Sequence, residues 1–145
     1  EAERRGYRCR CIRCREVGRL EEDRDVAAED AGLVRREYEA SGSKEVFLSF
    51  EDGNALFGYA RLRKCPDIAR LRELRVLGEL VPVSQKPGPR WQHRGIGTLL
   101  LKECERIAKE EWNSECLHVT SGVGARKYYE MFDFSRFGPY MGKSF

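Results

Sequence analysis

Alternating apolar and charged positions predict a succession of strands in the first half of the chain. The pattern is clearest at Leu71-Arg72-Glu73-Leu74-Arg75-Val76-Leu77, where apolar residues alternate with charged ones as in a half-buried strand. Ser41-Gly42-Ser43 and Glu51-Asp52-Gly53-Asn54 are turn signals, and the second is typical of a hairpin. Strands are therefore expected over residues 46–50, 56–63 and 70–80, and the alternating charges of residues 8–13 permit another.

The second half of the chain changes to a helical pattern. From Gly95 to Trp112 apolar residues follow helical spacing, with charged residues on the other face. Residues 116–120 form a short apolar run that suits a buried strand. A second helix is expected over residues 126–132 and a closing strand over residues 137–145. A strand meander followed by helix, strand, helix and strand predicts an α+β fold with a mixed central sheet flanked by helices.

A pair of glycines lies where the predicted central strand gives way to the first helix. Gln92-His93-Arg94-Gly95-Ile96-Gly97 runs directly into that helix. Two glycines two residues apart let the backbone approach an anion, and the helix adds its positive N-terminal end. The nucleotide-binding loops do not fit, because no G-x-x-x-x-G-K-[ST] occurs and position 100, where a dinucleotide loop has its third glycine, is leucine. The spacing matches the acetyl-CoA motif of GNAT acetyltransferases, and the preceding strand can offer backbone groups to the peptide-like pantetheine arm.

The length and composition of the chain indicate one domain without a membrane-spanning segment. The chain has 145 residues, enough for a single core, and no apolar run approaches the length of about 18 residues that a membrane helix needs. Its first residues lack the hydrophobic stretch of a secretory signal, and the missing initiator Met suits a piece of a longer protein. Six cysteines without a signal favour a reducing compartment. A cytoplasmic protein with no membrane partner is the expectation.

Three cysteines stand close together near the start of the chain. Cys9, Cys11 and Cys14 supply three soft metal ligands, whereas a structural zinc site needs four. Cys65, Cys116, a histidine or a missing part of the protein would have to complete it. Reduced thiols without metal are the alternative, and an iron–sulfur cluster held here alone is not expected, since four thiolates are usual.

The net charge is only +3, but the basic residues are clustered. Arg8, Arg10, Arg13 and Arg15 crowd the cysteine segment, and two further groups follow. Local clusters of this kind suit the phosphate backbone of a nucleic acid, with solvated faces as the alternative. The two further groups are Arg61, Arg63, Lys64, Arg70, Arg72 and Arg75, and Lys86, Arg90, His93 and Arg94.

Two side-chain types could take part in catalysis. Tyr128 and Tyr129 lie near the start of the second predicted helix, where a phenol can protonate a departing CoA thiolate or hydrogen-bond its sulfur. Adjacent residues of a helix point about 100° apart, so at most one of them faces a cofactor while the other packs in the core. Glu73 on the central strand is a candidate base acting through water, and pairing with a neighbouring arginine is the alternative.

Several segments of the chain, taken in order, point to one family. They are Arg8-Cys9-Arg10-Cys11-Ile12-Arg13-Cys14-Arg15-Glu16, Arg72-Glu73-Leu74-Arg75-Val76, Val81-Pro82-Val83, Gln92-His93-Arg94-Gly95-Ile96-Gly97, Ser121-Gly122-Val123-Gly124-Ala125-Arg126-Lys127-Tyr128-Tyr129 and Gly138-Pro139-Tyr140-Met141. Over nearly the whole chain they resemble the C-terminal acetyltransferase half of Elongator catalytic subunits, the tRNA uridine(34) acetyltransferase family.

The resemblance implies a GNAT fold, acetyl-CoA as cofactor and a role in carboxymethyl-type modification of wobble uridine 34 of tRNA. In that family an N-terminal radical-SAM half holds an iron–sulfur cluster and S-adenosylmethionine and generates the radical chemistry. The acetyltransferase half delivers the acetyl group and breaks the thioester. No Cys-x-x-x-Cys-x-x-Cys occurs in this chain, so it is expected to bind acetyl-CoA and tRNA without completing the modification.

Carried over by position, the resemblance also assigns the site residues. The pantetheine and acetyl group would contact Glu73, Leu74, Arg75 and Val76. The pyrophosphate would take backbone N–H groups of Ile96, Gly97 and Thr98, in a loop shaped by Gln92 and Gly95. Tyr129, with Tyr128 next to it, would lie near the sulfur, and Cys9, Cys11 and Cys14 would form a metal site beside the missing half.

Two other functions remain open at this stage. One is a protein lysine or small-amine N-acetyltransferase, although clustered arginines would repel an amine and favour an anionic polynucleotide. The other is a non-catalytic RNA-binding module. Residues 1–20 are interpreted as a basic, cysteine-bearing linker and residues 21–145 as the acetyltransferase domain, and a homodimer is left open.

Overall fold

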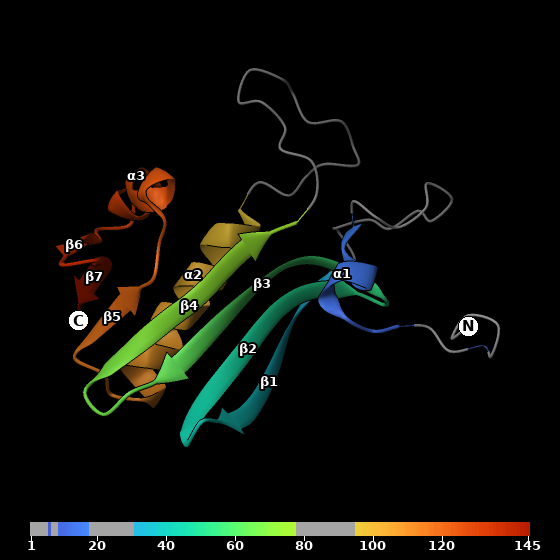
Figure 1. Cartoon of the computed structure of the whole chain (residues 1–145), viewed down its shortest axis with the longest axis horizontal. Helices are drawn as coiled ribbons and strands as arrows, with labels where there is room; N and C mark the ends of the chain where they lie inside the picture. Colours follow the sequence, from blue (N-terminus) through green and yellow to red (C-terminus); the bar gives the residue numbers. More distant parts are fainter. Residues whose placement is uncertain (1–5, 7–8, 18–30, 78–94) are drawn as a thin grey trace.

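The computed structural model describes residue 6 and residues 9–17, 31–77 and 95–145. Seven strands form one sheet in the order β1-β2-β3-β4-β5-β7-β6, and helix α2 lies behind it in Figure 1. The pair β4 and β5 is parallel and every other neighbouring pair is antiparallel. The expected α+β fold with a mixed central sheet is therefore confirmed. The strands are β1 (Gly32–Ala40), β2 (Ser43–Asp52), β3 (Ala55–Lys64), β4 (Ile68–Val76), β5 (Cys116–Val119), β6 (Ser135–Phe137) and β7 (Tyr140–Ser144).

Tight turns connect the first three strands because the turn residues adopt left-handed backbone conformations. Ser41 and Gly42 have φ angles of 50° and 69°, which suits the two-residue hairpin between β1 and β2. Gly53, with φ 52°, turns the chain between β2 and β3. The predicted strands over residues 46–50 and 56–63 are confirmed and extend to these turns. Of the next predicted strand, residues 70–76 are confirmed; the strand begins earlier, at Ile68, and ends before Leu77, and residues 78–80 lie outside the described part.

Helix α2 (Ile96–Arg106) continues as a π-helical segment over Ile107–Glu111. The helix predicted over residues 95–112 is thus confirmed to within a residue, with a wider last turn. Leu100 and Leu101 are fully buried against the sheet. Burial also raises the pKa of the Cys104 thiol, so this cysteine is an inert part of the core.

Gly58 lets the start of α2 approach the sheet closely. A Cβ atom at this β3 position would lie 2.9 Å from Ile96 Cγ2 and 3.0 Å from the Arg75 carbonyl oxygen. Both distances are shorter than normal packing permits, so any larger residue would push the helix away. An isolated glycine within a strand pattern is itself a signal of such close approach, and sequence reasoning missed it.

Two sequence predictions about local structure were wrong. The segment over residues 9–15 contains no strand among its described residues: Ile12–Arg15 forms the one-turn helix α1. The closing strand over residues 137–145 is instead the hairpin of β6 and β7, because Gly138, with φ 58°, turns the chain just before Pro139. In this hairpin β7 lies between β5 and β6.

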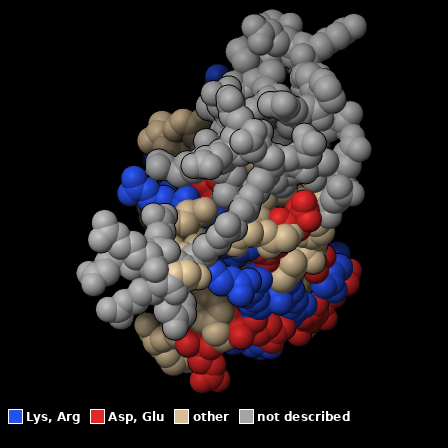
Figure 2. Space-filling view, turned by 90° about the vertical axis from the view of Figure 1, so that its right-hand side faces the viewer, with Lys and Arg blue, Asp and Glu red and all other residues tan. Residues whose placement is uncertain are grey.

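The β1 edge of the sheet carries charges of both signs. Figure 2 shows Lys and Arg interleaved with Asp and Glu on this side of the molecule. Both guanidinium nitrogens of Arg35 donate to Glu111 at 2.7 Å, which ties β1 to the end of the α2 region and lowers the pKa of Glu111 to about 2. Charged edge strands also discourage edge-to-edge association.

No helix in the described part of the chain is long and apolar enough to cross a membrane.

Candidate functional site

Strand β4 pairs with β5 only over its own first half. The parallel register runs from Ile68 opposite Cys116 to Leu71 opposite Val119, and the Thr120 N–H then donates to the Leu71 carbonyl at 3.1 Å. Beyond this point β4 continues to Val76, whereas the chain after β5 turns toward α3 (Arg126–Glu130). Figure 1 shows the two strands parting. Within the described part of the chain, the last residues of β4 therefore have no strand partner on the β5 side.

A β-bulge determines which residues of β4 face this opening. Arg61 is opposite Glu73 and Leu62 is opposite Leu71, so Arg72 is an extra residue on β4. The extra residue reverses the alternation of faces after Leu71. Leu74 and Val76 consequently lie on the α2 side.

The same register directs backbone groups of β4 into the opening. The Leu77 N–H donates to the Phe57 carbonyl on β3 at 2.8 Å, and Tyr59 is opposite Arg75. Because alternate residues of a strand direct their N–H and C=O groups to opposite sides, those of Leu74 and Val76 point away from β3, toward the β5 side. This arrangement presents a peptide-like edge to a ligand.

The N-terminus of α2 begins beside this opening. Gly95 caps the helix with a φ angle of 114°, a conformation that other residues rarely adopt. The first intrahelical bond runs from the Leu99 N–H to the Gly95 carbonyl, at 2.8 Å. The N–H groups of Ile96, Gly97 and Thr98 thus have no intrahelical acceptor, and with the helix dipole they suit an anion. Gln92, predicted to shape the loop, lies outside the described residues.

A cavity of about 300 Å³ joins these features. Its lining brings together residues from β4, from the start of α2 and from α3, which are far apart in the sequence. Five of the predicted cofactor residues from β4 and the start of α2 contribute, together with Tyr129, and Ala125 is an addition that no sequence signal indicated. The lining residues are Leu74, Val76, Gly95, Gly97, Thr98, Ala125, Tyr128 and Tyr129.

The two tyrosines have different environments. Tyr129 is 5% exposed and packs edge-on against Phe134, and burial raises its pKa to about 12. Tyr128 is half-buried, and its Oη lies 2.9 Å from the position of a Cβ atom on Gly97. That Oη is shielded from solvent and lies beside the Thr98 side chain; burial raises the pKa of Tyr128, and the contact with Thr98 opposes this in part. The hydroxyl at the anion-binding turn is therefore that of Tyr128.

Glu73 and Arg75 are not brought to the cavity. Glu73 Oε2 lies 3.6 Å from Arg61 Nη1, on the sheet face opposite α2. Arg75 is exposed and, opposite Tyr59 in the register, shares that face. The bulge at Arg72 explains both positions, and the alternation noted in the sequence did not reveal it.

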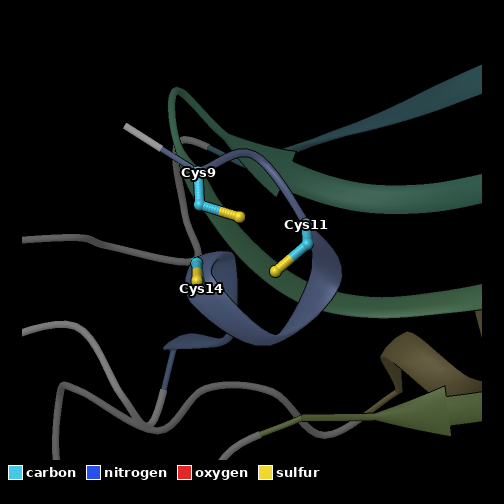
Figure 3. A group of neighbouring side chains, drawn as sticks. All are labelled: Cys9, Cys11 and Cys14. Carbon is cyan, nitrogen blue, oxygen red and sulfur yellow. The ribbon is translucent and has the colours of Figure 1, made fainter. Parts of the chain in front are cut away.

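The three N-terminal cysteines do come together. Their sulfur atoms lie within 4.8 Å of one another, around the turn of α1 (Figure 3). The backbone N–H of Cys14 and the neighbouring thiols lower the pKa of Cys11 to about 7, whereas the hydrogen bond to Cys11 raises the pKa of Cys14. Cys65 and Cys116 do not belong to this group, so a fourth ligand is not supplied by the described residues.

The arginines of the same segment differ in exposure. Arg10 and Arg13 are exposed beside the cysteines. Arg15 is 8% exposed and forms an ion pair with the buried Glu51, so it takes part in the packing of α1 on the sheet. Arg8 lies outside the described residues.

Comparison with known proteins places this geometry in a family. Residues 12–134 match the acetyltransferase (GNAT) family. The chain is 45% identical to Elongator complex protein 3 of Schizosaccharomyces pombe over 95% of its length, and 44% identical to the tRNA uridine(34) acetyltransferase of Methanocaldococcus infernus over 97%. It spans only 28% and 29% of those proteins.

A solved structure has the same fold. The archaeal Elp3 of Methanocaldococcus infernus, with an N-terminal deletion, superposes with a TM-score of 0.83 at 42% identity, over 99% of this chain and 37% of that one. The family match covers most of the described sheet as well as helix α2, whose N-terminus lines the cavity. The chain therefore belongs to the acetyltransferase (GNAT) family.

Proposed function

We propose that this chain binds acetyl-CoA between β4 and β5 and supports cleavage of its thioester. The observation that carries the proposal is the cavity where the free edge of β4 meets the N-terminus of α2. The amide-rich pantetheine arm would pair with backbone groups of Leu74 and Val76, as an added strand does. The pyrophosphate would accept the N–H groups of Ile96, Gly97 and Thr98.

Tyr128 is proposed as the proton donor to the leaving group. When a nucleophile attacks the acetyl carbonyl, the carbon–sulfur bond breaks and CoA leaves as a thiolate. The phenolic proton of Tyr128 would pass to that sulfur. A raised pKa keeps the phenol protonated near neutral pH, as a general acid requires. Tyr129 would hold Tyr128 in place, since their rings pack edge-on with centroids 5.3 Å apart.

We further propose tRNA as the acceptor-side substrate, with wobble uridine 34 as the modified base. Two archaeal relatives are named tRNA uridine(34) acetyltransferase, and the exposed Arg10 and Arg13 suit a phosphate backbone. In this proposal the radical step belongs to the N-terminal radical-SAM domain of a longer protein. Amine acetylation remains the second candidate, because acetyl transfer to amines would use the same thioester cavity.

Release of free CoA thiol from acetyl-CoA, with and without unmodified tRNA, tests the proposal. Stimulation by tRNA, with Arg10→Glu/Arg13→Glu reducing it, is the expected result. Equal release with and without tRNA, together with acetylation of a polyamine, would favour the amine reaction. Acetyl-CoA binding without any release would leave the chain as a non-catalytic RNA-binding module.

Cys9, Cys11 and Cys14 are proposed to hold a structural zinc ion. Three sulfurs at this spacing fit three corners of a tetrahedral zinc site, and the lowered pKa of Cys11 favours the thiolate that zinc needs. A bound zinc ion would fix the turn of α1. The fourth ligand would come from outside the described residues or from solvent.

Replacing Cys11 by Ser is expected to reduce bound zinc from about one ion per chain to well below one, because one of three thiolates is lost. Metal released by a thiol-blocking reagent and read with a chromogenic chelator gives the stoichiometry. Cys65→Ser is the matched control and should leave it unchanged. Equal zinc content in both variants would contradict the assignment.

A further inference from the structure

One face of the sheet carries no long helix among the described residues. Helix α2 covers the opposite face, as Figure 1 shows from the open side. Of the helices that the structure describes, the four-residue α1 lies against the open face, through the ion pair of Arg15 with Glu51. A wide sheet surface of this kind is normally packed against something.

A single row of cross-strand neighbours crosses this open face. The strand registers align one residue from each of six strands, and neighbours in an aligned row share a face of the sheet. The row begins with a tyrosine, passes a buried glutamate and two arginines, and ends at a histidine and a glycine. In order, its members are Tyr38, Glu45, Arg63, Arg70, His118 and Gly142.

Aromatic rings gather at the β5–β7 end of the row. The His118 ring stacks on Tyr140, with centroids 5.9 Å apart and planes at 18°, and its centroid lies 4.9 Å from that of Phe137. Gly142 leaves room for this stack, because a Cβ atom there would lie 3.3 Å from His118 Cδ2. Phe137 is 62% exposed although it is a large apolar ring. The stack therefore ends in a ring face open to solvent.

Positive charge lies directly beside these rings. The guanidinium of Arg70 lies over Tyr140, 5.0 Å from the ring centroid, and it forms no ion pair with a described carboxylate. Arg63 and Arg70 are opposite each other, an arrangement that is unfavourable for like charges. Arg63 is balanced by the buried Glu45, 3.1 Å away. Arg70 keeps an unbalanced charge.

Glu45 cannot neutralise the remaining arginines of this face. Its carboxylate is fully buried, and it is shared by Arg61, Arg63 and Arg72, at 3.4, 3.1 and 2.8 Å. The single carboxylate of Glu45 is therefore shared by three guanidinium groups, of which Arg61 also lies 3.6 Å from Glu73. Arg72 remains 42% exposed and can donate to a further acceptor.

We propose that this open sheet face binds unpaired nucleotides of an RNA, with a base stacked on the exposed ring of Phe137 and phosphates held by Arg70 and Arg72. An exposed aromatic ring beside guanidinium groups that can donate to phosphates suits single-stranded RNA recognition. The proposal rests on the proposed tRNA substrate and assigns a face to its unpaired loop. Burial and the neighbouring Arg70 lower the pKa of His118, so its ring is neutral at neutral pH and stacks without adding charge.

Fluorescence anisotropy with a labelled uridine-rich single-stranded oligonucleotide, in a salt series, tests the proposal on the full 145-residue chain. Phe137→Ala should weaken binding by about 5- to 160-fold without changing the salt dependence, because stacking is worth about 1–3 kcal/mol per base. Arg70→Gln should lower the slope of log affinity against log salt by about one. Phe137→Tyr keeps an aromatic ring at this position and should bind the oligonucleotide as the wild-type chain does. Met131→Ala is the matched control: it removes an apolar side chain that is 71% exposed elsewhere, and the affinity should not change.

The outcomes separate this face from the proposed substrate. Suppose that the chain binds tRNA and that Arg10→Glu/Arg13→Glu weakens this binding, whereas Phe137→Ala and Arg70→Gln leave it unchanged. The proposal for the sheet face is then overturned, while the tRNA substrate stands. The face would then be a protein-docking surface. If the chain binds acetyl-CoA but neither oligonucleotide nor tRNA, the substrate proposal fails and the face proposal with it.

Discussion

Replacing Tyr128 by Phe is expected to slow thioester cleavage by about 10²- to 10⁴-fold, the range that a lost general acid accounts for. The Tyr128 hydroxyl is the phenol that lies beside Gly97 and Thr98 at the start of α2. Phe retains the ring and its packing against Phe132 at 5.1 Å between centroids. The affinity for acetyl-CoA should therefore stay within a few-fold. Initial rates of free thiol release and a binding isotherm measure the two quantities.

Tyr129→Phe provides the matched control. Its ring belongs to the core, so loss of its hydroxyl should leave the rate within a few-fold. A pH profile adds a second readout: in the wild-type protein the rate should fall as the pH rises through the raised pKa of Tyr128, because only the protonated phenol can donate. The assignment is reversed if Tyr129→Phe loses the rate and Tyr128→Phe keeps it.

Gly97→Val is expected to weaken acetyl-CoA binding by about 100-fold or more, which corresponds to about 2.7 kcal/mol. A Cβ atom at this position would lie 2.9 Å from Tyr128 Oη and 3.3 Å from Val76 Cγ2. These atoms come from two walls of the cavity, so the branched side chain would fill the space between them. It would also keep a pyrophosphate from the backbone N–H groups. Isothermal titration with acetyl-CoA measures the loss.

Gly122→Val is the control that separates a loss of acetyl-CoA affinity at Gly97 from any general effect of replacing a glycine by valine. A Cβ atom there would meet no atom within 4 Å, and its φ angle of −66° suits any residue. Crowding at Gly97 should also lower the stability of the fold by about 1–3 kcal/mol, so thermal unfolding is followed in parallel. A folded Gly97→Val protein with unchanged affinity would place the cofactor elsewhere.

Local patterns were sufficient where neighbouring residues decide the structure. The turn at Gly53 and the helix after Gly95 depend on turn chemistry and on apolar spacing within one segment, so both could be read from the sequence. The closing segment was read as one strand because its turn at Gly138–Pro139 separates two very short strands. Three residues of β6 are too few to show an alternating pattern.

The candidate site shows the limit of such patterns more clearly. Gly95, Gly97 and Thr98 were predicted from a contiguous motif, and the structure brings them to the cavity. Glu73 was predicted beside them, yet it lies on the open face with Arg61. The two consecutive charges at Arg72 and Glu73 interrupt the alternation and are the one signal that could have indicated the bulge.

The sequence by itself determined the succession of strands and helices, the glycine turn at the start of α2 and the grouping of three cysteines. Each of these depends on residues that are close in the chain, where backbone conformation and side-chain spacing act directly. Only the tertiary structure decided which tyrosine hydroxyl lies beside Gly97, which face Glu73 occupies, and that Arg70 meets the rings of β5 and β7. These depend on strand register and on the parting of β4 from β5, which are set by packing between segments far apart in the chain.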